Sequence, residues 1–382
     1  MTLRRIDHYI VAVPQDDAFT YEQFSEPSSE KLAWLLLRQL TDIPDRGMSP
    51  IPGTLQERRI AYQEFRNYVR QGITYWDAAR SIVGSAAALP YYYSVMNLAK
   101  AELVRAHPSL IVGEKLTHGL VFKPSKSNSI SGDYLQVAAN GVFPLLYKHR
   151  TGTAIPAGTR LPIKNLLSLI PEIGLEVNVV GRTRPAATPG YQTLASNSES
   201  AWPLVMTYAD TFADRREPGT RAFLRSFEEV PLIEMPNWRD IFAISRRAHG
   251  DGFAIFQART TFAGEASGAI DGGMYAAATH LHDVMGEYIS EPIGREGEFI
   301  FTPTLRKSHP LVLPLDLARY AAMYYLSSVV RYKPAALDPV SQGAQAWLMD
   351  SFTREVPSDL LANMVMGVRG TKILFNAASY RV

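Results

Sequence analysis

Apolar residues recur every three to four positions near both ends of the chain, which is the spacing of one helix face. The leucines of residues 28–41 share such a face, and the pattern predicts a helix there. The same spacing predicts helices over 315–332, 339–355 and 358–366. Both ends of the chain are therefore expected to be helical.

The residue types at its start predict a second helix. Thr54 and Glu57 have the spacing of a capping box, in which each side chain bonds the backbone of the other, and we expect Gly72 to end this helix. A further helix is predicted over 74–106. Pro90 within it predicts a kink or a division into two helices, because proline removes a helix hydrogen bond.

The middle of the chain has a different pattern, with short apolar runs separated by Gly, Pro, Ser and Thr. Strands are predicted over 134–138, 141–148, 204–208 and 253–262. Helices are predicted over 163–170, 219–229 and 274–288. The segment 185–200 is rich in Ala, Thr, Pro, Ser and Asn and predicts an exposed loop.

This order of elements predicts an α+β fold that is mainly helical. Both chain ends form a helical body, and a mixed β/α region is inserted between them. The expected boundaries are 1–125 for the N-terminal helical part, 126–310 for the mixed region, and 311–382 for C-terminal helices that pack on the N-terminal ones.

Composition narrows the classes of function. The absence of cysteine excludes disulfides, Cys-ligated zinc, iron–sulfur clusters and a thiol nucleophile. With 39 Lys and Arg against 37 Asp and Glu, the chain has little net charge for non-specific nucleic-acid binding. The uncharged stretch 81–99 contains Pro, Asn and Ser, so we interpret it as a buried helix and not a membrane span. We expect a cytoplasmic protein without a membrane anchor or signal peptide.

Common catalytic signatures are absent from the sequence. It contains no phosphate-binding loop of the G-x-x-x-x-G-K-[ST] type, no G-x-G-x-x-G, no H-E-x-x-H, no G-x-S-x-G and no D-x-D pair. Any chemistry must therefore come from individual charged residues in unusual surroundings.

One helix places polar groups where apolar ones are expected. Tyr93, Asn97 and Lys100 lie at i, i+4 and i+7 and share one face of an otherwise apolar segment. A buried amide and a buried ammonium are costly unless they find partners. His118 and the polar end of the C-terminal helix near Arg331 are the candidate partners.

Two interpretations of these residues remain open. They could form a structural cluster that locks two long helices together. Alternatively, they could bind an anionic ligand, with Lys100 and Arg331 on its phosphates and His118 as a general acid or base whose pKa lies near neutrality. The other ligand-binding candidates are Tyr93, Asn97, Tyr332 and Lys333.

A separate candidate is a metal site in the middle region. His280, Asp283 and Glu287 lie at i, i+3 and i+7 of a predicted helix, and an imidazole with two carboxylates could hold a divalent metal. A solvated polar helix face explains the same spacing. A divalent metal is thus the one cofactor that the sequence suggests.

Four segments together resemble a known family. The run Tyr-Tyr-Ser-x-x-Asn-Leu-x-Lys-Ala at 92–101, His-Gly-Leu at 118–120, Asn-Gly-Val-Phe at 140–143 and Ser-x-x-x-Arg-Tyr-x-Pro at 327–334 are similar to the YaaC-like proteins of bacteria. Some members of that family are found with antiviral defence genes. The resemblance implies an association with defence, and it implies no specific reaction.

The first long helix pair also resembles the helical HEPN domains, many of which are ribonucleases. Their catalytic motif is an Arg followed by His after four to six residues, and none of the eight histidines has an Arg at that distance. The resemblance therefore implies a shared fold without the ribonuclease motif.

Our leading hypothesis is a protein that binds or processes nucleotides by phosphoryl or nucleotidyl transfer. Its partner would be a nucleotide or another phosphorylated small molecule. The alternative is a non-catalytic helical scaffold that regulates an enzyme encoded nearby, and a weaker alternative is a divergent HEPN-type ribonuclease. A homo-oligomer is compatible with each of them.

Overall fold

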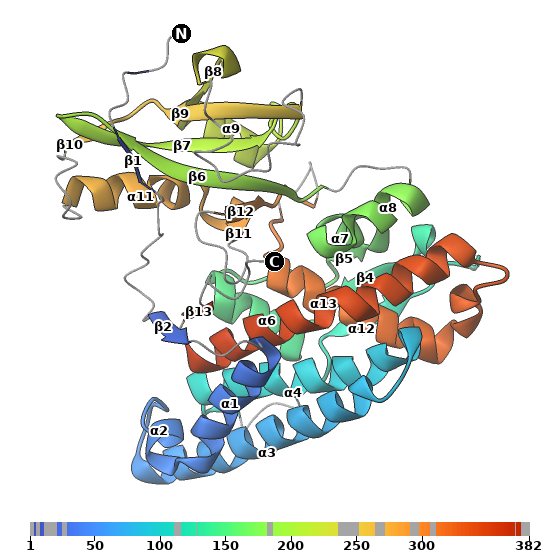
Figure 1. Cartoon of the computed structure of the whole chain (residues 1–382). Helices are drawn as coiled ribbons and strands as arrows, with labels where there is room; N and C mark the ends of the chain where they lie inside the picture. The colour runs from blue at the N-terminus through green and yellow to red at the C-terminus, as the bar shows by residue number, and fades with distance from the viewer. Residues whose placement is uncertain are drawn as a thin grey trace. The chain divides into compact units, whose positions relative to one another are not determined.

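The structure is a computed structural model of the 382-residue chain. It describes residues 4, 8–10, 21–24, 29–110, 116–127, 129–181, 186–235, 252–263, 272–290, 298–305, 311–370 and 372–375. The chain divides into two compact units, which are drawn in Figure 1. The helical unit comprises 20–185 and 315–382, and the sheet unit comprises 1–19 and 186–314.

The fold is α+β and mainly helical, and helices from both chain ends form one unit, as predicted. The boundaries of that unit differ from the expected ones. Residues 126–185 belong to the helical unit, and the sheet unit begins at 186 and ends at 314. Within the described residues, no helix has both the length and the apolar character that crossing a membrane requires.

The helical unit contains helices that precede the sheet unit in the sequence and helices that follow it. Its helices are α1 (Ser29–Asp42), α2 (Pro44–Met48), α3 (Leu55–Arg80), α4 (Ala88–Ala106), α6 (Val142–Thr151), α7 (Ile163–Ser168), α8 (Gly174–Gly181), α12 (Leu315–Tyr332) and α13 (Gly343–Arg369). Its 3-10 turns are η1 (Gly84–Ala87), η2 (Ile130–Gly132), η3 (Pro171–Ile173) and η7 (Pro334–Leu337). Strands β3 (Leu120–Lys123), β4 (Tyr134–Val137) and β5 (Arg160–Pro162) form a small antiparallel sheet, and β2 (Tyr21–Phe24) pairs in parallel with β13 (Lys372–Phe375).

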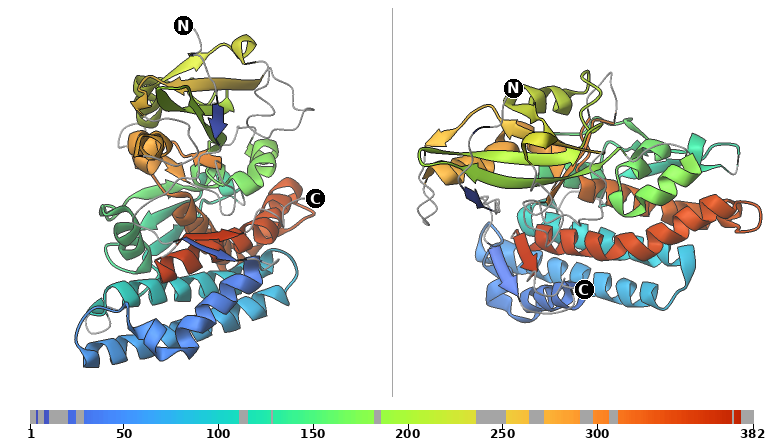
Figure 2. Two further views of the ribbon diagram at one scale, coloured as in Figure 1. Left: turned by 60° about the vertical axis from the view of Figure 1, so that its left-hand side comes forward. Right: turned by 45° about the horizontal axis from the view of Figure 1, so that its top comes forward.

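Helix α4 lies at the centre of this unit, against α3, α12 and α13 (Figures 1 and 2). Neighbours on several sides explain why α4 and α12 are apolar around most of their circumference. The 315–332 helix occurs at the predicted residues as α12. The capping box of Thr54 and Glu57 also begins α3 as predicted.

The ends of α3 and α4 differ from the prediction. Helix α3 continues through Gly72 to Arg80, because Gly72 serves close packing: a Cβ there would lie 3.2 Å from Cδ2 of Leu98 on α4. The hydroxyl of Ser94 on α4 donates to the Gly72 carbonyl at 2.7 Å. The 74–106 segment is divided into two helices, as predicted, because α3 ends at Arg80 and α4 begins at Ala88. Pro90 is not itself the point of division. It lies in the first turn of α4, where its nitrogen has no hydrogen bond to lose.

Three segments adopt a structure other than the predicted one. The apolar run 141–148 forms helix α6, not a strand, because short apolar runs fit both structures. The segment 185–200 contains strand β6 and not an exposed loop. The two predicted C-terminal helices are one helix, α13, which contains Pro357 because the apolar residues around it are buried in the core.

The sheet unit consists of an antiparallel sheet and a few helices. Its strands are β1 (His8–Ile10), β6 (Thr188–Ser196), β7 (Ser200–Tyr208), β8 (Phe227–Val230), β9 (Phe253–Ala258), β10 (Phe262–Ala263), β11 (Ile289–Ser290) and β12 (Glu298–Phe301). Its helices are α9 (Pro218–Ser226), η4 (Leu232–Glu234), α11 (Gly272–Met285) and η6 (Gly286–Tyr288). The strand order is β11-β12-β6-β7-β9-β8, with β1 paired to β6 and β10 to β7.

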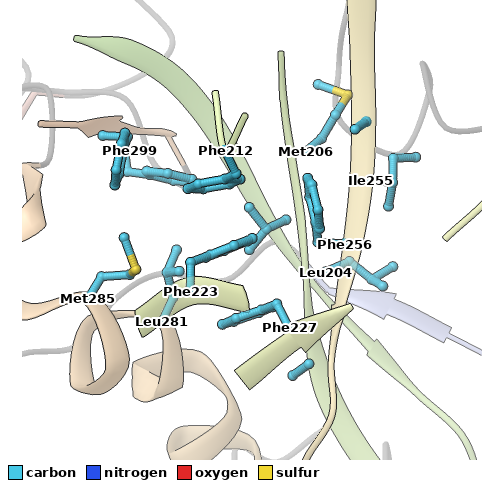
Figure 3. Packing of buried hydrophobic residues seen from close by; sticks show 14 of the residues in the cluster. Leu204, Met206, Phe212, Phe223, Phe227, Ile255, Phe256, Leu281, Met285 and Phe299 are labelled. Carbon is cyan, nitrogen blue, oxygen red and sulfur yellow. The ribbon is translucent and has the colours of Figure 1, made fainter. Parts of the chain in front are cut away.

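Phenylalanine rings fill the core of the sheet unit (Figure 3). Phe212 stacks on Phe223 with ring centroids 3.9 Å apart, and Phe223 stacks on Phe227 at 4.5 Å. Leu281 and Met285 of α11 cover these rings, as Figure 3 shows. This core is apolar and separate from the polar cluster described next, which lies wholly in the helical unit.

Candidate functional site

Two glycines hold the loop that carries His118 against the start of α6. Gly119 has φ +77° and Gly141 has φ +124°, both in the region that disfavours residues with a Cβ. A Cβ on Gly119 would lie 2.4 Å from Cδ of Pro144, and a Cβ on Gly141 would lie 2.5 Å from Cα of Gly119. Only glycines allow the two backbones to come this close.

Backbone hydrogen bonds fix the same contact. The Phe143 N–H donates to the His118 carbonyl at 3.2 Å, and the Val142 N–H donates to the Thr117 carbonyl at 2.8 Å. The first turn of α6 thus uses these amides to hold the loop. The His-Gly-Leu and Asn-Gly-Val-Phe segments, far apart in the sequence, form one structural element.

Two tyrosines from different helices determine where the His118 ring lies. The Tyr92 hydroxyl on α4 is hydrogen-bonded to Nδ1 of His118 at 2.8 Å, and the imidazole tautomer determines which of them donates. The Tyr324 ring on α12 lies 5.7 Å from the imidazole, and its hydroxyl donates to the Leu120 carbonyl at 2.8 Å. The imidazole is therefore held between α4 and α12.

The electrostatic environment keeps His118 neutral at neutral pH. Burial lowers the pKa of His118, and the positive charges of Arg331 and Lys100 lower this pKa further. Burial also raises the pKa of Tyr92 well above its usual value, so its hydroxyl stays protonated. The positive charges of Lys100 and Arg331 therefore both act on the His118 imidazole. We call Lys100, His118 and Arg331 the cationic cluster.

Lys100 occupies a partly buried position on α4. Its Nζ lies 5.4 Å from the centroid of the Tyr68 ring, which gives a cation–π contact. Burial lowers the pKa of the ammonium group. No carboxylate in the described part of the chain forms an ion pair with it.

Arg331 lies in the last turn of α12 and bonds mainly to its own helix. Its Nε donates to the Ser327 carbonyl at 3.1 Å, and its guanidinium carbon lies 4.9 Å from the centroid of the Tyr332 ring. Tyr332 itself is 68% exposed. Among the described residues Arg331 has no carboxylate partner, so its charge is also uncompensated.

The other two candidate residues on α4, Asn97 and Tyr93, each contact other residues of the helical unit. Asn97 is 3% exposed, and its Nδ2 donates to the Tyr93 carbonyl one turn earlier at 2.8 Å. The Tyr93 ring stacks on Tyr75 with centroids 5.2 Å apart. Asn97 is thus directed toward the backbone of its own helix, whereas Tyr93 forms part of an aromatic group beside His118.

Lys333 is held in a buried ion pair. Its Nζ lies 2.9 Å from Oδ1 of Asp133, and that carboxylate also accepts hydrogen bonds from the Tyr325 hydroxyl at 2.8 Å and the Ser125 N–H at 2.7 Å. Lys333 is 9% exposed and Asp133 is fully buried. The structure therefore places Lys333 away from any role that would need a free charge, and the sequence contained no signal that paired it with Asp133.

Other buried cations of the helical unit are paired as well. Arg150 bonds both Glu102 and Asp316, and Arg319 bonds Glu172. Burial alone would lower the pKa of Arg150, but the two carboxylates outweigh burial and raise it. Lys100 and Arg331 of the cationic cluster differ from these paired cations, because neither has a carboxylate partner among the described residues.

The structure does not assemble the predicted metal site. Helix α11 ends at Met285, so Glu287 lies in the following 3-10 turn, beyond the predicted helix face. The His280 ring lies between Phe227 and Phe262 at 5.6 and 5.2 Å, and burial lowers its pKa. Asp283 accepts a hydrogen bond from Thr279. Over the described ranges no three His, Asp or Glu side chains form a group that could hold a metal ion.

Comparison with known proteins identifies a family. A model of the YaaC-like protein family matches residues 50–366, a range that includes α4, the His118 loop, the start of α6 and α12. No curated protein and no solved structure matches the chain significantly.

Proposed function

The chain belongs to the YaaC-like protein family, and we propose that it binds a nucleotide through the cationic cluster. In this proposal Lys100 and Arg331 contact the phosphates, and His118 lies beside the group that reacts. We place this activity in bacterial antiviral defence or nucleotide regulation.

The observation that carries the proposal is the uncompensated charge. Lys100 and Arg331 lower the pKa of one imidazole, and neither has a carboxylate partner among the described residues, whereas Lys333, Arg150 and Arg319 in the same unit are each paired. A desolvated cation is unfavourable unless an anion compensates it. A phosphate group supplies two negative charges and several acceptors for a lysine and an arginine.

Aromatic residues next to the cluster favour a nucleotide over a simple phosphate. The Tyr93 ring lies 6.5 Å from the His118 ring, and the exposed Tyr332 ring lies beside Arg331. Such rings give a base or a guanidinium a flat surface on which to stack. These contacts support a ligand with both phosphate and base.

If the protein is an enzyme, phosphoryl or nucleotidyl transfer fits the residues best. Tyr92 holds Nδ1 of His118, which leaves Nε2 as the atom that would exchange a proton with the substrate. A neutral imidazole would accept the proton of an attacking hydroxyl as the new oxygen–phosphorus bond forms and the bond from phosphorus to the leaving group breaks. The leaving group, a nucleoside diphosphate in phosphoryl transfer or pyrophosphate in nucleotidyl transfer, would depart with the bonding electrons. Lys100 and Arg331 would neutralise the negative charge that develops on the phosphoryl oxygens.

The test is a titration of the purified protein with a panel of nucleotides by calorimetry. We expect Lys100→Ala and Arg331→Ala to weaken binding by about 10–100-fold each, the loss of one charge-assisted contact of about 1.5–3 kcal/mol. Arg354→Ala removes an exposed arginine elsewhere in the helical unit and should bind like the wild type. The proposal fails if the wild type binds no nucleotide or if all variants bind equally.

Mass spectrometry of small molecules released from the denatured protein gives an independent test. A phosphorylated compound that co-purifies with the wild type and not with Lys100→Ala would support the proposal. Its absence from both, together with a negative titration, would reject it.

A second candidate function is a helical scaffold that regulates a partner enzyme. The observation that favours it is the density of paired buried charges, such as Lys333 with Asp133, which can lock helices in place without binding anything. This reading predicts that Asn97→Ala and Arg331→Ala unfold the protein. Thermal melts separate the two functions, because folded variants that no longer bind nucleotide would reject the scaffold.

A divergent ribonuclease has its own test. RNA that stays intact after incubation with the pure protein would reject that function.

A further inference from the structure

Two histidines meet where α4 and α6 end. His107 directly follows α4, and His149 lies in the last turn of α6. Nε2 of His107 and Nδ1 of His149 are 3.2 Å apart, and the two rings are perpendicular, with an interplanar angle of 89°. They form a hydrogen-bonded pair in which one proton lies between the two nitrogens.

The distance between these nitrogens also suits two ligands of one metal ion. Zinc–imidazole bonds are about 2.0–2.1 Å long, and a tetrahedral angle between them puts the two nitrogens about 3.3–3.4 Å apart. The observed 3.2 Å is close to that separation. A metal ion could therefore replace the shared proton if the two rings turn so that both nitrogen lone pairs point at it, without a change in the separation of the nitrogens.

Glu102 lies near the second ring nitrogen of His149, at ion-pair distance and beyond hydrogen-bond distance. Its Oε1 lies 3.7 Å from Nε2 of His149, on the side of the ring opposite His107. Glu102 is 2% exposed and is held by Arg150, whose Nε donates to Oε1 at 2.9 Å. A carboxylate beside Nε2 favours the tautomer with a proton there, which leaves the Nδ1 lone pair for a metal.

The surroundings favour a cation more than the side-chain charges alone suggest. The ends of α4 and α6 direct the negative poles of two helix dipoles toward the pair, although Lys148 nearby opposes this effect. Metal ions bind the neutral form of an imidazole.

Room for further ligands exists beside the pair. A cavity of about 430 Å³ is lined by both histidines together with Leu103, Ser109 and Leu145. Among residues that the structure describes, no third His, Asp or Glu joins the two imidazoles. A metal ion bound here would keep open positions that face this cavity.

We propose that His107 and His149 chelate a borderline transition-metal ion of the Zn²⁺, Ni²⁺ or Cu²⁺ class, with Glu102 orienting His149 and with the open positions taken by water or by an external ligand. Two imidazoles suit these ions and disfavour Mg²⁺ and Ca²⁺, which prefer oxygen. A site with only two protein ligands exchanges its metal readily, so it would respond to metal availability. The proposal does not depend on nucleotide binding.

The test uses Cu²⁺ and Zn²⁺ alone, with glycine as a competitor that removes weakly bound metal. We expect one Cu²⁺ per chain, with an electron paramagnetic resonance spectrum that shows coupling to two imidazole nitrogens. His107→Ala and His149→Ala should each weaken binding at least 10-fold and abolish the two-nitrogen signal. His282→Ala removes an imidazole from the sheet unit and should change neither.

Glu102→Gln tests the orienting carboxylate. We expect metal affinity about 10–100-fold lower with the two-nitrogen signal retained, because the ligands remain and only their orientation suffers. Since this substitution also weakens the Arg150 ion pair, a thermal melt without metal checks that the variant is folded, and the histidine variants decide if it is not. The proposal is overturned if the doubly substituted His107→Ala/His149→Ala chain binds Cu²⁺ as the wild type does.

Discussion

The Tyr92 hydroxyl lies 2.8 Å from Nδ1 of His118 and connects the polar face of α4 to the loop that precedes β3. Tyr92 is fully buried, so its ring cannot move aside without opening the helix core. One imidazole nitrogen is thereby occupied, and the chemistry available to His118 is restricted to Nε2.

Tyr92→Phe should keep the fold and release the imidazole. Loss of one hydrogen bond costs about 0.5–1.5 kcal/mol of unfolding free energy, which urea denaturation measures. The imidazole proton signals of His118 should shift in the NMR spectrum because Nδ1 loses its partner. Tyr324→Phe is the matched control, because it removes a hydroxyl bonded to the Leu120 carbonyl and not to His118. Unchanged His118 signals in Tyr92→Phe would contradict the contact.

Two lysines of the helical unit should respond in opposite ways to removal of their charge. Lys333→Met leaves Asp133 buried without its counter-ion and should lower the unfolding free energy by about 3–5 kcal/mol. Lys100→Met removes a desolvated ammonium that has no carboxylate partner among the described residues. Its stability should stay the same or rise, while nucleotide binding should weaken about 10–100-fold.

Urea denaturation of both lysine variants provides the comparison, with Arg354→Met as an exposed control that should leave the midpoint unchanged. The double variant Lys333→Met/Asp133→Leu should recover much of the stability, since it removes both buried charges. Equal destabilisation by Lys100→Met and Lys333→Met would show that Lys100 is a structural residue.

Gly119→Ala should be more destabilising than Gly152→Ala, although both glycines have a positive φ. A positive φ costs an alanine about 1–2 kcal/mol at either position. Gly152 has open space around it, whereas a Cβ on Gly119 would collide with Pro144 and the α6 backbone. Thermal melts should rank wild type, Gly152→Ala and Gly119→Ala in falling order. The reverse order would contradict the close contact between the His118 loop and α6.

Acidification should weaken the fold through His118. Burial and the neighbouring cations lower its folded pKa below the ordinary value of 6.5, so the unfolded chain binds more protons between these two values. The contribution of His118 to the unfolding free energy is therefore fully present above about pH 7. It is lost as the pH drops below about 6.5 and through the folded pKa.

The melting temperature measured between pH 8 and pH 5 checks this dependence. His118→Gln cannot take up the proton and should show a shallower fall. His149 and His280 also have lowered pKa values, so a residual slope should remain in that variant. A slope as steep as that of the wild type would show that His118 does not contribute.

Local patterns predicted much of the helical unit. The apolar spacing of 315–332 and the capping box at Thr54 correspond to α12 and to the start of α3. The predictions failed where distant contacts decide the structure. Gly72 continues a helix because Leu98 packs against it, and residues 185–200 form β6 because β7, β1 and β12 pair with that strand. The sequence around Gly72 does not reveal that Leu98 packs there, and the composition of 185–200 does not reveal its partner strands.

The sequence predicted the charged residues of the candidate site but not the residues that contact them. An ammonium within an apolar helix identified Lys100, and the end of an aromatic helix identified Arg331. The sequence could not show that Asp133 takes up Lys333, or that Tyr92 holds His118, because both contacts join different elements of the fold. Which cation remains uncompensated is decided by the tertiary structure alone.

The insertion of the sheet unit within the helical unit has a consequence for synthesis. The Tyr324–Leu120 contact joins residues 204 positions apart, and the entire 186–314 segment lies between them. At about 5–20 residues per second, the ribosome needs about 10–40 s to make this distance of chain. During that interval the nascent protein has Lys100 and His118 but lacks Arg331, so a prematurely terminated chain cannot assemble the complete cluster.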